Sequence, residues 1–384
     1  MNATHRWSRA HILRAVSMVV SLAPMLPSLR LAAQAPAAFV HGLASNASTW
    51  GSTPQELASQ FNIQTRAPSL SAFSFYGSQA AQLNSWLPAQ FSVPLTNLIA
   101  IGHSNGGIVS REANRQFQPM QGVITIGTPH DGAFAAQRLR QGYITDYFQD
   151  MAAQATAPLY YYGTNYYSDA CFSVCYLLWN GINNLYQGVA YALDASGFLI
   201  AAGATDGTVL EEMVPGSSFL ASLNGSVNLA REASAIPRRI AVTSMADPSL
   251  TSLFVGLFPN SANSLTNWQF RSANVYLLYY EFYADYNDWN DMYAWDKRAH
   301  AFLWWNGAMA LANIDYHWCN LIGGFNFGLN RCESDGIVAT TAQVWPGNTR
   351  TYEIVNGPGH LQETTSTLVK DKLIRALLEN GFTF

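Results

Sequence analysis

The residues Leu98-Ile99-Ala100-Ile101 run directly into Gly102-His103-Ser104-Asn105-Gly106-Gly107, and this stretch decides the fold. The four apolar residues predict a buried strand, and Ile108 to Gln116 predicts a helix. A strand that turns into a helix at G-x-S-x-G is typical of a serine whose hydroxyl stands above the edge of a parallel sheet. Side chains at positions 102 and 106 would collide with the adjoining helix or strand, so both positions need glycine. The stretch therefore predicts that Ser104 is a nucleophile.

Apolar runs and helix-like segments alternate on both sides of this motif. The further strand candidates are Ala37 to Val40, Val123 to Ile126, Ile240 to Thr243 and Thr351 to Val355. The further helix candidates are Pro54 to Gln60, Tyr76 to Trp86 and Thr364 to Leu378. Such alternation is the pattern of an α/β domain with a parallel sheet. Together with the Ser104 turn, it predicts an α/β-hydrolase fold, with a mostly parallel central sheet and helices on both faces.

Two stretches depart from the alternation. Residues 150–210 contain a tyrosine cluster and the first pair of cysteines, and residues 250–330 contain most of the tryptophans. We interpret both as cap or lid insertions in a single domain that spans residues 36–384. Some of these aromatic side chains are expected to form a satellite core.

The composition excludes two classes of protein. Of the 384 residues, 49% are hydrophobic and only 11% are charged, which is incompatible with a disordered chain. The chain has 20 basic and 24 acidic residues, for a formal net charge of −4, so it has no excess of positive charge for binding nucleic acid. With 19 Tyr, 20 Phe and 11 Trp, the chain carries many rings for a core or for apolar ligands.

The N-terminal 35 residues predict a signal peptide. Basic residues between His5 and Arg14 precede the apolar run Ala15 to Ala23, and Ala33-Gln34-Ala35 offers a cleavage site, with a cut after Ala23 as the alternative. No later stretch reaches about 18 uninterrupted apolar residues, so no transmembrane segment is expected in the mature chain. We therefore predict a secreted or periplasmic protein.

Four cysteines are present: Cys171, Cys175, Cys319 and Cys332. An even number in an exported chain predicts two disulfides, for which three connectivities exist. Pairing of neighbours is the simplest choice and would place Cys319–Cys332 in a loop just before Asp335. A zinc site that combines these thiols with His317 is the alternative, disfavoured because no C-x-x-C spacing is present.

A serine nucleophile needs a base and an acid downstream, in the order Ser, Asp or Glu, His. We predict that His360 is the base, because it follows the strand Thr351 to Val355 and precedes the last helix. The other histidines lie in the signal peptide, before any candidate acid, or in an insertion: His5, His11, His41, His103, His130, His300 and His317.

Three aspartates are candidates for the acid. Asp335 lies between the second insertion and the last strand and is favoured, with Glu333 as a neighbour that could replace it. Asp247 follows the strand Ile240 to Thr243, a second place where this fold puts its acid, and Asp206 lies in a loop-like stretch.

The motifs together resemble those of secreted bacterial lipases and of related esterases similar to GPI inositol-deacylases. The resemblance covers parts of residues 36–132 and 211–384 and not the insertions. It is carried by His41-Gly42-Leu43, Gly102 to Gly107, Gly127-Thr128-Pro129-His130-Asp131-Gly132, Pro215 to Leu220 with Leu223-Asn224, Ser334 to Val338 and Gly359-His360-Leu361.

The resemblance implies that Ser104 is the nucleophile, Asp335 the acid and His360 the base. It also implies an oxyanion hole made by the backbone N–H groups of Leu43 and Asn105, as the motif geometry requires. Lipases of this kind often bind calcium through an Asp two residues after the histidine, where this chain has Gln362. We therefore predict no metal and no cofactor.

These features predict a serine hydrolase that acts on carboxylic esters with apolar or lipid-like parts. The low charge and the aromatic insertions favour such substrates and are compatible with contact at a lipid interface. An acyltransferase with the same triad, and a non-catalytic module that binds apolar ligands on the same fold, are the alternatives. The sequence specifies no oligomeric state.

Overall fold

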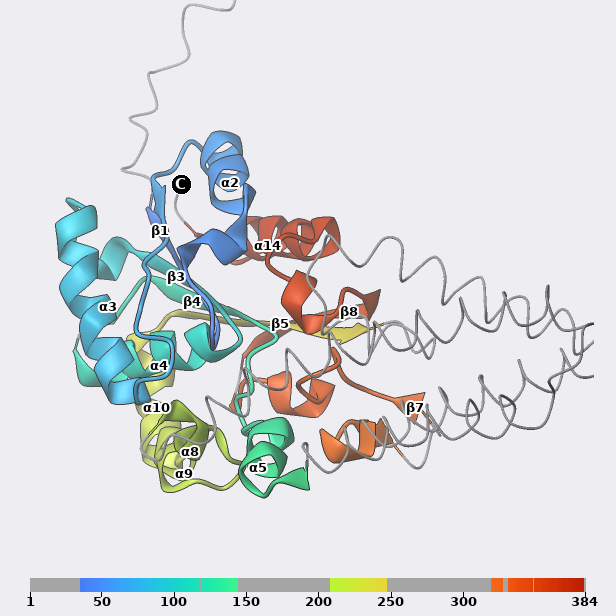
Figure 1. The fold of residues 1–384 in the computed structure, drawn as a ribbon. Coiled ribbons are helices and arrows are strands. Elements are labelled where there is room, and N and C mark those ends of the chain that lie inside the picture. The colour runs from blue at the N-terminus through green and yellow to red at the C-terminus, as the bar shows by residue number, and fades with distance from the viewer. Residues whose placement is uncertain are drawn as a thin grey trace, which may run out of the picture.

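Six strands lie side by side in one sheet, in the order β2-β1-β3-β4-β5-β8 (Figure 1). This computed structural model describes residues 35–117, 119–143, 208–246, 319–326, 331–347 and 349–382. Every pairing between neighbouring strands of the sheet is parallel. The strands are β1 (Ala37–Val40), β2 (Thr65–Arg66), β3 (Ile99–His103), β4 (Gly122–Ile126), β5 (Arg238–Ala246) and β8 (Arg350–Gly357).

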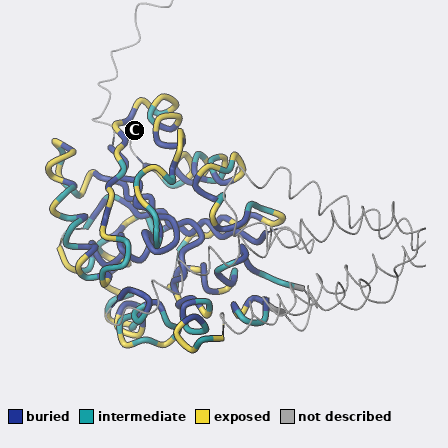
Figure 2. The backbone as a smooth tube through the Cα atoms, viewed as in Figure 1, coloured by how far each residue is buried: buried dark blue, intermediate teal, exposed yellow. Residues whose placement is uncertain are grey.

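Helices cover both faces of this sheet. Successive side chains of each strand point to opposite faces, so each strand packs against both layers of helices. Ala38 and Val40 of β1 pack in one core cluster with α3 (Tyr76–Gln90) and α4 (Asn105–Gln116). Ala37 and Phe39 pack in the other with α2 (Thr53–Phe61) and α14 (Thr367–Glu379). The central strands β1, β3 and β4 are buried along their whole length, as expected for strands covered on both faces, whereas the edge strand β8 is partly exposed (Figure 2).

Shorter helices complete the described part of the chain. They are α5 (Phe134–Arg140), α8 (Val209–Met213), α9 (Ser218–Leu223) and α10 (Ser226–Ala235). Single 3-10 turns lie at η1 (Ala47–Trp50), η2 (Leu95–Asn97), η4 (Thr340–Gln343) and η5 (His360–Gln362). Two short strands, β6 (Phe325–Asn326) and β7 (Arg331–Cys332), pair in a separate antiparallel ladder.

The parallel sheet and its two helical layers confirm the predicted α/β-hydrolase fold. The boundaries differ in two instructive places. The helix after Ser104 begins at Asn105 rather than Ile108, so the turn is tighter than the apolar pattern indicates. The last helix begins at Thr367 rather than Thr364, because η5 and a turn take up the preceding residues.

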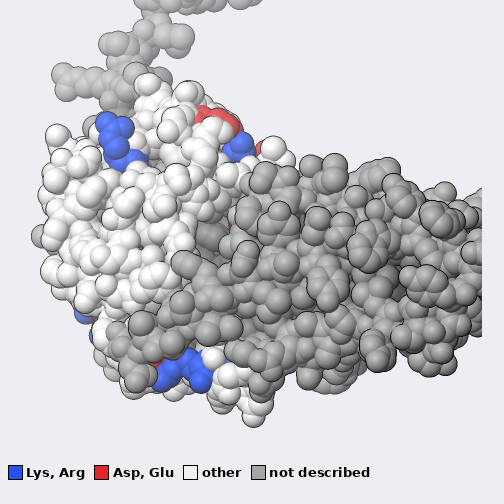
Figure 3. Space-filling view, in the orientation of Figure 1, with Lys and Arg blue, Asp and Glu red and all other residues white. Residues whose placement is uncertain are grey.

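Several predictions lie outside the described residues: the signal peptide, the Cys171–Cys175 pair and almost all of the two insertions. Cys319 and Cys332 do form a disulfide, with Cα atoms 5.9 Å apart, which confirms the neighbour pairing for this pair. Among the described helices, none is long and apolar enough to cross a membrane. Charged side chains are few and scattered on the described part of the face in Figure 3, as the composition predicts.

Candidate active site

Ser104 lies on the sharp turn between β3 and α4. Its φ of 53° and ψ of −127° are rare for a residue with a side chain, and such strain is concentrated at functional sites. The Ser104 N–H donates to the Ile126 carbonyl at 2.8 Å, which ties the turn to the end of β4. Ser104 therefore lies at the carboxyl edge of the parallel sheet.

The glycines of the motif are required by close backbone contacts. A Cβ atom on Gly102 would lie 2.5 Å from the carbonyl oxygen of Gly106, and one on Gly106 would lie 2.3 Å from that of Val40. Both distances are far below van der Waals contact. This confirms that the turn can form only if positions 102 and 106 lack side chains.

Asp335 and His360 are in direct contact. The Nδ1 atom of His360 lies 2.7 Å from Oδ2 of Asp335, and the His360 backbone N–H donates to the Asp335 carbonyl at 2.8 Å. Both residues are buried. Because the carboxylate accepts from Nδ1, the Nε2 atom of a neutral His360 is left free to act as a base.

His103, the residue before Ser104 in the chain, contacts His360. The rings of His103 and His360 lie 4.8 Å apart. Within the described residues, the Ser104 hydroxyl makes no hydrogen bond with His360. Without substrate, the contact between a catalytic serine and its histidine is often long. It shortens to about 2.6–3.2 Å when substrate binds.

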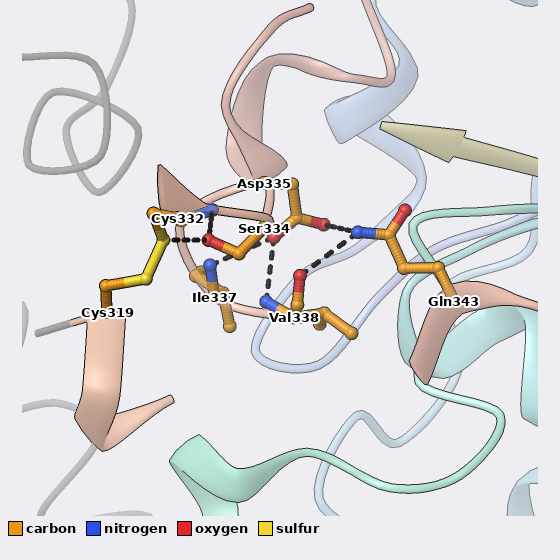
Figure 4. Close-up of a disulfide and its surroundings, with 8 residues drawn as sticks. Cys319, Cys332, Ser334, Asp335, Ile337, Val338 and Gln343 are labelled. Carbon is orange, nitrogen blue, oxygen red and sulfur yellow. Dashed lines mark hydrogen bonds between the residues drawn. A yellow bond between two sulfur atoms is a disulfide. The ribbon is translucent and has the colours of Figure 1, made fainter. Parts of the chain in front are cut away.

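A turn holds the Asp335 carboxylate in place (Figure 4). Its Oδ1 atom accepts from the backbone N–H groups of Ile337 at 2.9 Å and Val338 at 2.7 Å. Its Oδ2 atom lies 3.0 Å from Nε2 of Gln343, which donates to it. The disulfide lies beside this turn, since the Cys332 sulfur is 3.4 Å from the Ser334 hydroxyl.

Two backbone N–H groups near Ser104 have no protein acceptor among the described residues: those of Leu43 and Asn105. Asn105 is fully buried and is the first residue of α4, where N–H groups are left unpaired and the helix dipole is positive. Gly42 brings the Leu43 loop against Ser104, since a Cβ on Gly42 would lie 3.4 Å from the Ser104 hydroxyl oxygen. Both N–H groups thus lie near the serine, and because neither has a protein acceptor, they are available to bind an anion.

His41 fixes this loop. Its Nδ1–H donates to the Gly42 carbonyl at 2.9 Å, so its Nε2 atom accepts the Leu70 N–H at 2.8 Å. Burial lowers the pKa of His41, which keeps the ring neutral, as both hydrogen bonds require. The sequence suggested no role for this residue beyond its place in the motif.

The other candidate acids are placed less directly. Asp247 and Asp206 lie outside the described residues. Glu333 is described, and its backbone N–H donates to the Gly324 carbonyl oxygen. The carboxylate that contacts Nδ1 of His360 is that of Asp335.

Sequence reasoning missed Gln343 and Glu363, neither of which belongs to a recognisable motif. Glu363 is fully buried, and its Oε2 atom lies 3.1 Å from Nε2 of His103 and 3.6 Å from Nδ1 of His360. Atoms of Glu363, His103 and His360 all lie within 4.8 Å of one another, a spacing that a metal ion could use. We assign no metal to this cluster, because Nε2 of His103 and Nδ1 of His360, the nitrogens nearest Glu363, are engaged in hydrogen bonds to protein oxygens.

No family model matches the chain, and no curated protein matches it in sequence. Among solved structures, a lipase of Bacillus licheniformis in its mature form is similar at 15% identity and a TM-score of 0.46, over 94% of this chain and 96% of the lipase. A gene product of Listeria innocua matches at 10% identity and a TM-score of 0.38, over 90% and 94% of the two chains. An extracellular α/β-hydrolase of a Paenibacillus species matches at 18% identity and a TM-score of 0.23, over 27% and 46%.

The parallel sheet with the Ser104 turn at its carboxyl edge defines an α/β-hydrolase fold. The fold alone does not define the chemistry of the site, because one fold hosts many activities.

Proposed function

We propose that the chain is a serine hydrolase of carboxylic esters, with Ser104 as nucleophile, His360 as base and Asp335 as acid. The observation that carries the proposal is the short Asp335–His360 contact at the sheet edge to which the strained Ser104 turn belongs. A buried carboxylate on Nδ1 holds the imidazole in the tautomer that can take the serine proton.

In the proposed reaction, the Ser104 oxygen attacks the ester carbonyl carbon while its proton passes to Nε2 of His360. The carbonyl oxygen becomes an oxyanion, which the N–H groups of Leu43 and Asn105 would bind. Removing one such donor typically costs about 2.7–4 kcal/mol of activation free energy. His360 then gives its proton to the departing alcohol, and water, activated by the same histidine, releases the acid and restores Ser104.

The substrate class and the location of the protein belong to this proposal. We infer esters with apolar or lipid-like parts, because the chain is rich in aromatic residues and low in charge. The Cys319–Cys332 disulfide supports function outside the cytoplasm, since disulfides persist in oxidising compartments.

The test combines labelling with turnover. A fluorophosphonate should label Ser104, and p-nitrophenyl esters of increasing chain length should be hydrolysed. Ser104→Ala should abolish both while the fold is kept, because alanine fits the same backbone turn. Ser85→Ala, at an exposed position of α3, is the matched control and should behave as wild type. Absence of labelling and turnover in the folded wild type would exclude the proposal in favour of a binding module.

A further inference from the structure

Glu363 is a buried carboxyl that the proposed reaction does not use. It directly follows η5, and its side chain is fully enclosed. Its Oε2 atom lies 3.1 Å from Nε2 of His103, while Oε1 has no hydrogen-bond partner among the described residues. A buried acid in contact with two histidines calls for an explanation, because burying an unused carboxyl is costly.

The fold leaves space for this carboxyl at the end of β4. Gly127 has a φ of +53°, and a Cβ atom there would clash with Oε2 of Glu363. A side chain at position 127 would therefore displace Glu363. Gly127 is thus needed for a specific reason, since it lets the carboxyl of Glu363 lie against the backbone at the end of β4.

His103 connects Glu363 to the backbone of His360. The His103 Nε2 atom lies 3.0 Å from the His360 carbonyl oxygen, which can only accept, so Nε2 carries the hydrogen. The same N–H faces Oε2 of Glu363. One ring nitrogen therefore bridges the carboxyl and the residue proposed as the base.

The charges of the cluster follow from its burial. Burial and the nearby Asp335 charge raise the pKa of Glu363 well above its usual value. Burial and the neighbouring His360 lower the pKa of His103 well below its usual value. The titratable groups that face Glu363 are His103 from β3, His360 from η5 and Asp335 from the turn before η4. Both shifts favour the uncharged forms, a protonated Glu363 and a neutral His103.

The charge state of Glu363 matters because its Oε2 atom lies only 3.6 Å from Nδ1 of His360. A second carboxylate there would compete with Asp335 for the Nδ1 hydrogen and turn the imidazole away from the serine. Two nearby carboxyl groups with separated pKa values are a known way to give each a different role.

We propose that Glu363 is a positioning residue: its carboxyl, acting through His103, fixes the ring and backbone of His360 while Asp335 alone takes the Nδ1 hydrogen. The proposal rests on the proposed function, since it assigns Glu363 a part in that same site.

Three variants test it: Glu363→Gln, Glu363→Met and, as a control for loss of an acidic residue, Glu353→Gln on the exposed side of β8. Methionine has similar size but no carbonyl oxygen to receive the His103 N–H, so kcat for ester hydrolysis should fall about 10- to 100-fold with KM little changed. Glutamine keeps the acceptor and cannot ionise, so it should restore most of kcat at pH 7. A purely structural role would change the melting temperature but not kcat of the folded protein.

The pH profile gives a second readout that does not depend on the methionine variant folding. If Glu363 ionises as the pH is raised into the alkaline range, kcat of the wild type and of Glu353→Gln should decline there, whereas Glu363→Gln should show no such decline. Unchanged kcat in folded Glu363→Met, or an alkaline decline that persists in Glu363→Gln, would overturn the proposal. A glutamine variant as impaired as the methionine one would overturn it too, by showing that a carboxylate is needed.

Failure of the proposed function gives a different result from failure of the role of Glu363. In that case the wild type hydrolyses no ester and Ser104 is not labelled. In the cases that overturn the role of Glu363, the wild type is active and labelled.

Discussion

The Nε2 atom of Gln343 lies 3.0 Å from Oδ2 of Asp335, the same oxygen that Nδ1 of His360 approaches to 2.7 Å. Gln343 also binds both backbone groups of Ser244: its Oε1 accepts the N–H at 2.7 Å, and its Nε2 lies 3.0 Å from the carbonyl oxygen. One amide thus joins the carboxylate to β5, so the position of the proposed acid is set by the central sheet as well as by its own turn.

Gln343→Met should therefore weaken both the fold and catalysis. The Ser244 N–H and carbonyl lose their buried partner, and the free energy of unfolding should fall by about 1–3 kcal/mol. Asp335 loses a donor that restrains it, so kcat should fall as well. Denaturant unfolding and ester hydrolysis measure the two effects. Gln55→Met, at an exposed position of α2, is the control, and equal unfolding midpoints for both variants would contradict the prediction.

The Cys319–Cys332 disulfide should support both stability and turnover. It closes a short loop, with a sequence separation of 13, and such loops contribute about 3 kcal/mol in the chain-entropy model. Through the contact of the Cys332 sulfur with Ser334, it also borders the Asp335 turn. A Cys319→Ser, Cys332→Ser double variant should have a lower melting temperature and a lower kcat at temperatures where it is folded. Loss of stability with full kcat would show that the bond only closes a loop.

Five of the six strands of the central sheet could be predicted because buried parallel strands are rich in apolar residues, which a sequence displays directly, whereas the two-residue β2 (Thr65–Arg66) could not. Ile99 to His103 with the Ser104 turn shows this best, since strand, glycines and serine are consecutive. The helices α8 to α10 were not predicted. They are short, and α8 begins at the edge of a stretch interpreted as an insertion.

The polar support of the site could not be predicted for a different reason. His103 and Glu363 meet across 260 positions of sequence, and Gln343 meets Ser244 across 99. Neither pair has a local spacing that distinguishes it from ordinary surface polar residues. Asp335 and His360 could be selected only because strand order limits where an acid and a base can lie.

Gly106→Ala should prevent folding or destabilise the chain by about 3 kcal/mol, the upper end for overpacking, because the new Cβ would lie 2.3 Å from the Val40 carbonyl oxygen. Gly77→Ala is the matched control within a helix. Its Cβ would approach only the end of the Gln116 side chain, at 3.2 Å, and alanine favours the helix by up to about 1 kcal/mol. Thermal unfolding of both proteins checks the prediction, which is wrong if the two substitutions are tolerated equally.

The last prediction concerns His130, a fully buried histidine whose charge state is set by its partners. Arg111 can only donate, so its NH1 atom, 3.1 Å away, makes the His130 Nδ1 an acceptor. Nε2 therefore carries the hydrogen and donates to the Thr125 hydroxyl at 3.0 Å. Burial and the Arg111 charge lower the pKa of His130 well below its usual value, so the folded protein keeps this ring neutral.

Stability should consequently fall as the pH drops below about 6.5, because the unfolded chain takes up a proton on His130 that the folded chain refuses. The effect of one such group is about 1.4 kcal/mol per pH unit until its folded pKa is reached. Glu363 acts in the opposite direction, since the folded chain keeps a proton there that the unfolded chain loses above about pH 4.5. Glu363 is common to wild type and His130→Gln, so the difference between their unfolding free energies isolates His130. That difference should favour the wild type most at pH 7 and shrink towards pH 5, and parallel curves would show that His130 titrates alike in both states.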